Sequence, residues 1–394
     1  MSDRSITRVC HVIVGLNVGG AELMLNRLIQ SHLSSVGYEH AVISLTSLGS
    51  VGARLQAQGV EVQVLDLRGA WDVLPKLVAL MKIFQQIRPD VVQTWMYHAD
   101  FLGGLAARMA GIKNVIWGIR ATDVSAGGSR ATGAVRWLCA RLSRWIPHTI
   151  VCAAEASRRV HVALGYRADR MTVVPNGFDL PRLQATPEQV AGLRSACGFS
   201  ADKVVVGTLG RFNAVKDPHN FVRAAGLLAR EYPRVQFLMV GRDCDAANAQ
   251  LIGWIKATGY ADRFVLLGER SDAPVCLAAM DVFCLSSRTE GFPNVVGEAM
   301  AMRKACVVTD VGDAAYLLGD CGVVVPKEDS AALADGMTQL VSLSVADRAE
   351  VGERAHARIA SEFTMDRTRE RFEAVYANVL SGQALQQVNK NKQG

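Results

Sequence analysis

Short apolar runs rich in β-branched residues recur along the chain, and helix-length amphipathic segments separate them. Such runs are typical of strands that helices cover on both faces, because a strand buried on both sides shows no polar alternation. The first half contains them at 9–16, 40–45, 60–67, 90–95, 114–119, 149–154 and 171–176. The second half contains them at 203–211, 235–241, 263–268, 281–286, 304–309 and 321–326. Two successive β-α-β series predict an α/β protein with two doubly wound, Rossmann-like parallel-sheet domains that face a central cleft.

The break between the two series falls near 177–190, where the chain has no apolar period and contains two prolines. We therefore expect a first domain over 1–178 and a second over 179–361. An amphipathic helix at 362–380 is expected to close the first domain. The polar tail at 381–394 is expected to be disordered.

The composition excludes several classes of protein. Half of the 394 residues are apolar and a fifth are charged, which excludes a disordered chain. No window approaches the ~18 to 20 apolar residues of a membrane span, and the first apolar run is too short for a signal peptide, so we expect a cytoplasmic protein. The nine cysteines form no CxxC pair and mostly lie in apolar runs. We expect them to be reduced and buried, without a disulfide framework or a zinc site.

The net charge of +6 is concentrated in the first half, and the segment 108–170 contains eleven Lys and Arg against three acids. Its densest part is a helix predicted over 132–146, where Arg136, Trp137, Arg141 and Arg144 lie opposite the apolar face. An indole among arginines is typical of a helix at a membrane interface. Two interpretations remain: peripheral contact with an anionic membrane, or an ordinary surface helix. No nucleic-acid-binding motif occurs, so nucleic acid is not an expected partner.

Glycines follow the first predicted strand. Gly19 and Gly20 lie at a helix start, where backbone N–H groups and the helix dipole favour an anion such as phosphate. A tight turn is the alternative. The loop is not GxGxxG, which argues against a dinucleotide-dependent dehydrogenase.

Two cations follow the first strand of the second domain, in VVVGTLGRFNAVKDP. Arg211 comes directly after the strand, and Lys216 precedes the next helix. Two cations held together would repel each other unless they share a polyanion, so the pair predicts a diphosphate site. Two solvated surface cations are the alternative.

The segment SSRTEGFPNVVGEAMAM (286–302) predicts a loop and then a helix beginning near Pro293. The first backbone N–H groups of such a helix are free to receive a diphosphate. We expect these groups to be those of Asn294, Val295 and Val296. Glu298 lies one turn further on the same face, where a carboxylate can accept bonds from ribose hydroxyls. Glu290 precedes the helix and is expected to face the sugar of the same ligand.

Other polar residues follow the strands of the first domain. His98 comes after the fourth predicted strand, and Arg120 and Asp123 come after the fifth, so all three are expected at the mouth of the cleft. A structural histidine is the alternative for His98.

A DxD pattern occurs at Asp243, Cys244 and Asp245. In a metal-dependent transferase such a pair would bind a cation beside the diphosphate. Since the second domain already offers Arg211, Lys216 and a helix start, we expect no metal and no cofactor.

Together these motifs resemble the retaining glycosyltransferases of family 4, which have the GT-B architecture, over residues 9–380. EGFPNVVGE (290–298) matches the E-x7-E motif of that family, and GRFNAVKD resembles its Arg and Lys diphosphate pair. VVPNGFD, with Asn176 and Gly177, resembles the interdomain motif. Gly19 and Gly20 resemble the amino-terminal phosphate loop, and His98 resembles the histidine of the cleft.

The resemblance implies roles for these residues. Arg211 and Lys216 would hold the diphosphate, Glu298 the ribose and Glu290 the transferred sugar. The base would lie near Gly241, Arg242 and the loop 268–272. Arg120 stands where many relatives have a histidine, and it would contact the acceptor or its phosphate. The remaining donor contacts would come from Gly291, Phe292, Pro293, Asn294 and Val295.

The implied activity is transfer of a sugar, with retention, from a nucleotide diphosphate sugar to a hydroxyl of a glycan or lipid-linked acceptor in cell-surface polysaccharide synthesis. The donor would be a UDP-linked hexose or N-acetylhexosamine, and the groups nearest the reaction would be His98, Glu290, Arg211 and Lys216. A GT-B-fold nucleotide-sugar 2-epimerase is the alternative. It would need several acid/base groups around the sugar, for which only His98, Glu290 and Asp123 are candidates.

Overall fold

A computed structural model describes residues 6–33, 37–122 and 130–382, and the chain divides into two compact units. Unit 1 comprises residues 1–177 and 365–394, and unit 2 comprises 178–364. The boundaries expected from the sequence, after 178 and after 361, lie within three residues of these. Most of the tail expected to be disordered, 381–394, lies outside the described residues.

Unit 1 is built on a seven-stranded sheet in the order β3-β2-β1-β4-β5-β6-β7, with parallel pairing throughout. Its strands are β1 (Thr7–Ile13), β2 (Tyr38–Ser44), β3 (Glu61–Val64), β4 (Val91–Trp95), β5 (Val115–Ile119), β6 (Thr149–Cys152) and β7 (Met171–Val173). Each strand overlaps one of the predicted apolar runs. The predicted parallel sheet is therefore confirmed.

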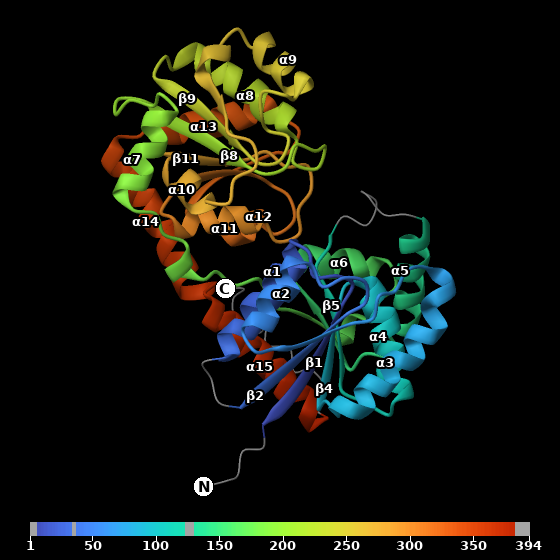
Figure 1. Ribbon diagram of the computed structural model, residues 1–394. Helices are drawn as coiled ribbons and strands as arrows, with labels where there is room; N and C mark the ends of the chain where they lie inside the picture. Colours follow the sequence, from blue (N-terminus) through green and yellow to red (C-terminus); the bar gives the residue numbers. More distant parts are fainter. Residues whose placement is uncertain (1–5, 34–36, 123–129, 383–394) are drawn as a thin grey trace. The chain divides into compact units, whose positions relative to one another are not determined.

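Helices cover both faces of this sheet (Figure 1). On one face α3 (Val73–Ile87), α4 (Tyr97–Met109) and α5 (Arg130–Leu142) pack on the strands, and a short 3-10 turn, η1 (Ala70–Asp72), precedes α3. On the other face lie α1 (Gly20–Leu33), α2 (Gly49–Ala57) and α15 (Met365–Ser381). Helix α6 (Glu155–Ala163) links β6 to β7. Phe372 and Tyr376 of α15 are fully buried in unit 1.

Unit 2 repeats the plan with six parallel strands in the order β10-β9-β8-β11-β12-β13. The strands are β8 (Val204–Leu209), β9 (Val235–Val240), β10 (Phe264–Leu266), β11 (Val282–Leu285), β12 (Ala305–Thr309) and β13 (Gly322–Val325). The helices are α7 (Pro187–Ala196), α8 (Pro218–Glu231), α9 (Ala249–Ala257), α10 (Ala273–Ala278), α11 (Asn294–Ala301), α12 (Ala314–Leu318), α13 (Ser330–Val341) and α14 (Val345–Glu362). Two sheets of this kind confirm the predicted doubly wound α/β class.

This topology gathers the motifs at sheet edges. In unit 2 the strand β8 lies between β9 and β11, so the loops that carry Arg211, Arg242 and Glu290 leave the same edge side by side. In open parallel sheets, ligands bind at this carboxyl edge. All nine cysteines are free thiols, and eight of them are buried. No helix in the described ranges is long and apolar enough to span a membrane.

Candidate functional site

The loops after β8 and β11 bring Lys216 and Glu290 into direct contact. Lys216 Nζ lies 2.6 Å from Glu290 Oε1, and Ser287 Oγ donates to the same carboxylate oxygen at 2.6 Å. The Glu290 side chain is only 11% exposed. The sequence predicted these two side chains for one ligand, and the structure pairs them with each other.

A second contact fixes the two loops. Asp217 begins helix α8 with a left-handed backbone (φ 46°), and its carboxylate caps the helix by accepting from the Asn220 amide at 3.2 Å. Arg288 Nε donates to the other Asp217 oxygen at 2.8 Å, and the Arg288 amide donates to the Val215 carbonyl at 2.8 Å. Lys216 is therefore held by its neighbours on both sides, which makes the position of its ammonium group well defined.

Arg211 differs from Lys216. Its side chain is exposed, and no ion pair joins it to another residue in the described parts of the chain. A small cavity opens beside it at the carboxyl ends of β8, β9 and β11, and its walls include Gly210, Lys216 and Ser287. An exposed guanidinium and a fixed ammonium beside one cavity form a suitable receptor for a polyanion.

Glycine 241 allows the β9 loop to approach the β8 loop. Gly241 has φ 141°, and a Cβ at this position would lie 2.0 Å from the Gly210 carbonyl oxygen. Its amide donates to the Gly268 carbonyl at 2.8 Å, so the β10 loop is attached as well. Arg242 forms an exposed ion pair with Glu269 at 3.2 Å. The segments expected around the base therefore adjoin the two cations.

The DxD pattern does not form a cluster of ligands. Asp245 Oδ1 accepts from the Ala247 amide at 2.9 Å and thereby caps a turn. Within the ranges that the structure describes, no group of three or more His, Cys, Asp or Glu side chains could hold a metal ion. That the protein works without a metal stays a prediction.

Helix α11 begins after Pro293, close to the predicted position. One expectation was wrong: the Val296 amide donates to the Pro293 carbonyl at 3.0 Å, because the first turn closes tightly, so this amide is not free. Gly297 allows Phe178 to pack on the helix, since a Cβ there would lie 2.0 Å from Phe178 Cζ. Glu298, the predicted ribose ligand, is partly buried in the next position.

In unit 1 the predicted phosphate loop already holds an anionic group. Helix α1 begins at Gly20, and a Cβ on Gly19 would lie 2.3 Å from Glu22 Oε2. The Glu22 carboxylate thus turns back over the helix start, and burial raises its pKa. Sequence reasoning missed Glu22, although an acid two residues after a Gly-Gly pair, in the first turn of a helix, interacts favourably with the helix dipole. A phosphate could bind here only after this carboxylate moves.

His98 lies at the second position of α4, and burial lowers its pKa, which favours the neutral imidazole. The preceding Met96 has φ 72°, and its amide donates to the Gly118 carbonyl at 2.8 Å. A non-glycine residue in the left-handed region is strained, and such residues gather at functional sites. This strain, which the sequence does not reveal, sets the direction in which α4 leaves the sheet and so the position of His98.

Arg120 points inward at the end of β5. Its guanidinium carbon lies 4.8 Å from the centroid of the Trp95 ring, and Nη1 donates to Asn176 Oδ1 at 2.8 Å. Among the residues that the structure describes, Nε and Nη2 have no hydrogen-bond partner, and burial lowers the pKa of the side chain to about 10. The expectation of an open acceptor contact is therefore not met in this arrangement. Asp123 lies outside the described residues.

The basic helix differs in one respect from the prediction. Trp137 is 55% exposed, and Arg141 lies 4.6 Å above its ring. Arg144 is exposed and Arg136 partly buried. The helix predicted over 132–146 ends earlier, at Leu142, and Trp145 beyond its end is 64% exposed.

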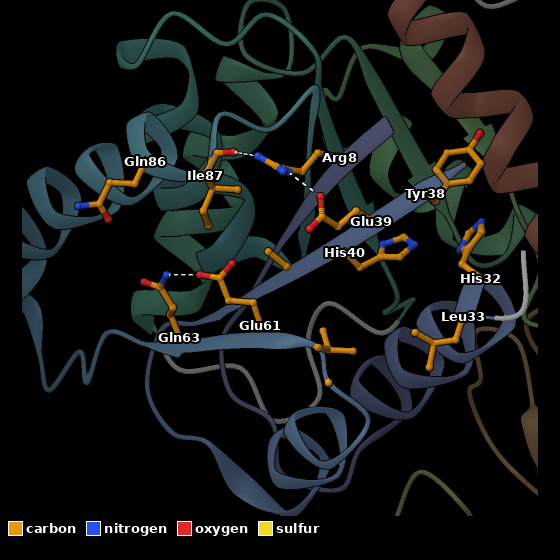
Figure 2. Close-up of a pocket in the computed structure, with 13 residues that line it drawn as sticks. Arg8, His32, Leu33, Tyr38, Glu39, His40, Glu61, Gln63, Gln86 and Ile87 are labelled. Carbon is orange, nitrogen blue, oxygen red and sulfur yellow. Dashed lines mark hydrogen bonds and ion pairs between the residues drawn. The ribbon is translucent and has the colours of Figure 1, made fainter. Parts of the chain in front are cut away.

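A cavity at the opposite, amino-terminal edge of the unit 1 sheet contains none of the predicted site residues (Figure 2). Arg8 crosses it, donating to the Ile87 carbonyl at 2.7 Å and pairing with Glu39 at 2.9 Å. His32 and His40 lie along one side, with burial lowering the pKa of both. This polar cavity lies at the wrong end of the strands for the predicted chemistry.

Two family sequence models match the chain. One is described as Glycosyltransferase Family 4 and matches residues 18–182, and the other is described as Glycosyl transferases group 1 and matches residues 203–342. Together they cover more than half of the chain, and each falls largely within one unit.

Curated relatives include transferases of bacterial glycans. The UDP-Gal:alpha-D-GlcNAc-diphosphoundecaprenol alpha-1,3-galactosyltransferase of Escherichia coli is 25% identical over 60% of this chain and 62% of its own length. This chain thus spans less than two thirds of that relative. The lipopolysaccharide core biosynthesis mannosyltransferase LpcC of Rhizobium leguminosarum bv. viciae is 29% identical over 65% of this chain and 70% of its own length.

Solved structures share the fold. The Anabaena protein Alr3699/HepE in complex with UDP has a TM-score of 0.83 at 21% identity, covering 94% of this chain and all of that one. The sucrose-phosphate synthase of Thermosynechococcus elongatus has a TM-score of 0.76 at 15% identity, covering 96% of this chain and all of that one. These likenesses concern the fold alone.

Proposed function

Because this chain belongs to the family 4 glycosyltransferases and has their GT-B architecture, we propose that it moves a sugar from a nucleoside diphosphate to an acceptor hydroxyl. The proposed donor is a UDP-linked hexose or N-acetylhexosamine. The proposed acceptor is a glycan or lipid-linked sugar of cell-surface polysaccharide synthesis. The name of the Escherichia coli relative, with its UDP-galactose donor and diphosphoundecaprenol-linked acceptor, supports both choices. The relatives named above are transferases, so nothing favours the epimerase alternative.

The observation that carries the proposal is the Lys216–Glu290 pair beside the exposed Arg211. Breaking the bond between the sugar and the phosphate places negative charge on the leaving diphosphate. Cations that are fixed before the reaction stabilise this charge without reorganising. Glu290 Oε1 lies 2.6 Å from Lys216 Nζ, so the ammonium group has a defined position on the edge of the cavity before the donor binds.

The reaction is proposed to retain the anomeric configuration. The bond between the anomeric carbon and the phosphate oxygen breaks, and the acceptor oxygen bonds to the same face of that carbon. The acceptor's proton passes to the leaving phosphate oxygen, so no protein group has to act as general base. His98 and Glu290 are assigned to the sugar, Glu298 to the ribose.

Further contacts with the donor are assigned to the loops around these residues. Asn294 and Val295 at the start of α11 would donate backbone N–H groups to the diphosphate, and the turn Gly291–Pro293 would shape that start. Gly241 and Arg242 would lie beside the base. The two protein cations make a metal ion unnecessary.

The protein is proposed to act in the cytoplasm at the inner face of the membrane. Helix α5 and the turn after it support this assignment, because Arg141, Arg144 and the half-exposed Trp137 give this segment the composition of an interfacial helix. A lipid-linked acceptor would be reached most easily from this position.

A thermal-shift panel of nucleotides and nucleotide sugars tests the proposed function. A ligand at 100 times its dissociation constant stabilises the state it binds by ~2.7 kcal/mol, which raises the melting temperature measurably. We expect UDP and one UDP-sugar to shift the transition, and EDTA to leave the shift unchanged. The absence of a shift with every UDP and GDP compound would overturn the proposal.

A further inference from the structure

Helix α3 is apolar on two opposite faces. Leu77, Leu80, Phe84 and Ile87 face the sheet and are buried. On the outer side Trp71, Leu74 and Val78 are 75%, 69% and 45% exposed, and Pro75 between them is exposed too. Their spacing of three and four residues places them in one stripe along the helix and the turn that leads into it. No part of unit 1 that the structure describes covers this stripe, which we call the α3 stripe.

The α3 stripe belongs to a helical layer that also carries two other exposed tryptophans. Of the six tryptophans in the chain, Trp71, Trp137 and Trp145 are more than half exposed. All three lie on or next to α3 and α5, and both helices pack against α4, on the same face of the sheet (Figure 1). Exposed indoles are typical of surfaces that meet a membrane interface.

Exposed cations occur on the same layer of helices. Lys82 on α3, Arg108 on α4 and Arg141 and Arg144 at the end of α5 are all exposed. In this layer Asp72 is buried and pairs with Lys76, so it does not offset the outer cations. The surface therefore combines apolar side chains with net positive charge, which is complementary to anionic phospholipid.

We propose that the α3 stripe inserts into the interface of an anionic phospholipid membrane and is the apolar anchor that works with the cations of α5. Stable peripheral binding requires two signals, and a basic patch alone is released by salt. The proposal rests on the proposed function in one respect: membrane binding would give access to the lipid-linked acceptor. The binding itself does not depend on glycosyl transfer.

The size of the stripe favours a membrane over a second copy of the chain. A large side chain offers about 150 to 250 Å², so the exposed fractions of Trp71, Leu74 and Val78 add up to roughly 400 Å². A stable protein interface needs about 800 Å² from each partner. Side chains that insert into the interface need no such matching surface.

Flotation with vesicles tests the proposal on the full-length protein. The vesicles contain phosphatidylglycerol and phosphatidylcholine, or phosphatidylcholine alone. Trp71→Ser with Leu74→Ser removes the anchor, and Arg141→Ala with Arg144→Ala removes two cations. Val345→Ser, which changes a 78% exposed residue of unit 2, is the matched control. Circular dichroism checks that each variant is folded.

We expect wild type and Val345→Ser to float with the anionic vesicles. The α3 variant should bind at least about tenfold more weakly at low and at physiological salt, because apolar insertion is insensitive to screening. The α5 variant should lose affinity mainly at low salt. Equal flotation of the α3 variant and wild type would overturn the proposal, as would wild type that fails to float. A dimer in sedimentation velocity that only the α3 variant loses, without vesicle binding, would identify a second copy as the occupant and would also overturn it.

UDP binding measured on the same preparations separates the two proposals. If UDP still binds but the protein does not float, the proposed membrane insertion of the α3 stripe is overturned and the proposed function is not. Flotation without binding of UDP or GDP by any preparation overturns the proposed function alone.

Discussion

Acidification should destabilise unit 1, because a cluster of three buried histidines is held there in the neutral form, and a fourth buried histidine, His161, contacts Tyr97 and Tyr166 instead. His11 and His32 are at most 1% exposed and His40 is 9% exposed. Trp95 Nε1 donates to His11 Nδ1 at 3.2 Å, which leaves the His11 proton on Nε2, facing His40 Nδ1 at 2.9 Å. This chain of hydrogen bonds has no place for an additional proton. Sequence reasoning missed the cluster. Alternate residues of a strand share a sheet face, so His11 could have been expected on the same buried face as Ile13.

Burial is the main cause that lowers the pKa of each histidine in the cluster. It lowers the pKa of His32 to about 4 and that of His40 to about 3, and the pKa of His11 lies well below its ordinary value. Glu373 Oε1 lies 3.3 Å from His32 Nε2, but Arg369 beside it offsets its charge. The unfolded chain takes up protons below about pH 6.5, whereas the folded chain does not. The contribution to stability is therefore complete above pH 6.5 and is lost as the pH falls toward 4.

The size of the effect follows from these pKa values. Each excluded proton costs about 1.36 kcal/mol per pH unit, so one histidine costs about 2 kcal/mol at pH 5 and three cost about 6. Asp100 acts in the opposite direction, because burial raises its pKa to about 7 and the folded chain gains a proton there. This offsets about 2 kcal/mol, which leaves a net loss of about 4 kcal/mol from the cluster and Asp100, a large part of a typical stability. Burial also lowers the pKa of His161, which adds to the loss.

Urea unfolding followed by tryptophan fluorescence is a suitable assay, because five of the six tryptophans lie in unit 1. In His40→Gln the amide oxygen can still accept from His11, and one excluded proton is removed. The loss between about pH 6.5 and 5 should shrink by about 2 kcal/mol, and above about pH 7 the two proteins should differ by a constant. An equal loss in wild type and variant, or stability that does not change with pH, would refute the reasoning.

Three further predictions concern unit 2, to which the donor is proposed to bind. Glu290→Gln should lower turnover by about 10- to 100-fold while UDP still binds, because Lys216 loses its ion-pair partner and shifts. Steady-state kinetics measures the turnover, and a UDP titration measures the binding. Gly297→Ala should destabilise unit 2 by about 1 to 3 kcal/mol and raise the donor KM, because its Cβ would lie 2.0 Å from Phe178 Cζ. Urea unfolding and steady-state kinetics measure the two effects, and an unchanged unfolding midpoint would contradict the prediction. EDTA should leave the transfer rate unchanged, and a rate restored only by added Mg²⁺ or Mn²⁺ would show that the two cations do not suffice.

The sequence was sufficient for the strands and for the residues at their ends. An apolar run between amphipathic segments predicts a buried parallel strand, and the chemistry then follows at its carboxyl end, as for Arg211 after β8. The contact between Lys216 and Glu290 could not be predicted in this way. It depends on β11 pairing with β8 instead of with β10, and strand order is a property of the whole sheet.

Other features depend on segments that are distant in the sequence. Arg120 is covered by Trp95 from β4 and lies 5.6 Å from the Phe372 ring of α15, so its inward direction becomes visible only in three dimensions. The α3 stripe was missed for a different reason. A helix that is apolar on both sides predicts full burial when the sequence is considered alone, and only the exposure of Trp71 and Leu74 separates the two cases.

The central claim is that a nucleoside diphosphate binds to the two cations at the carboxyl end of β8. Titration calorimetry with UDP measures this directly on wild type, Lys216→Met and Lys203→Met. Lys203 precedes the same strand at its other end and is the matched control. The account predicts that UDP binds to wild type and to the Lys203 variant, and that the Lys216 variant binds about 100-fold more weakly. Equal affinity of all three proteins, or no binding of UDP or GDP to wild type, would contradict it.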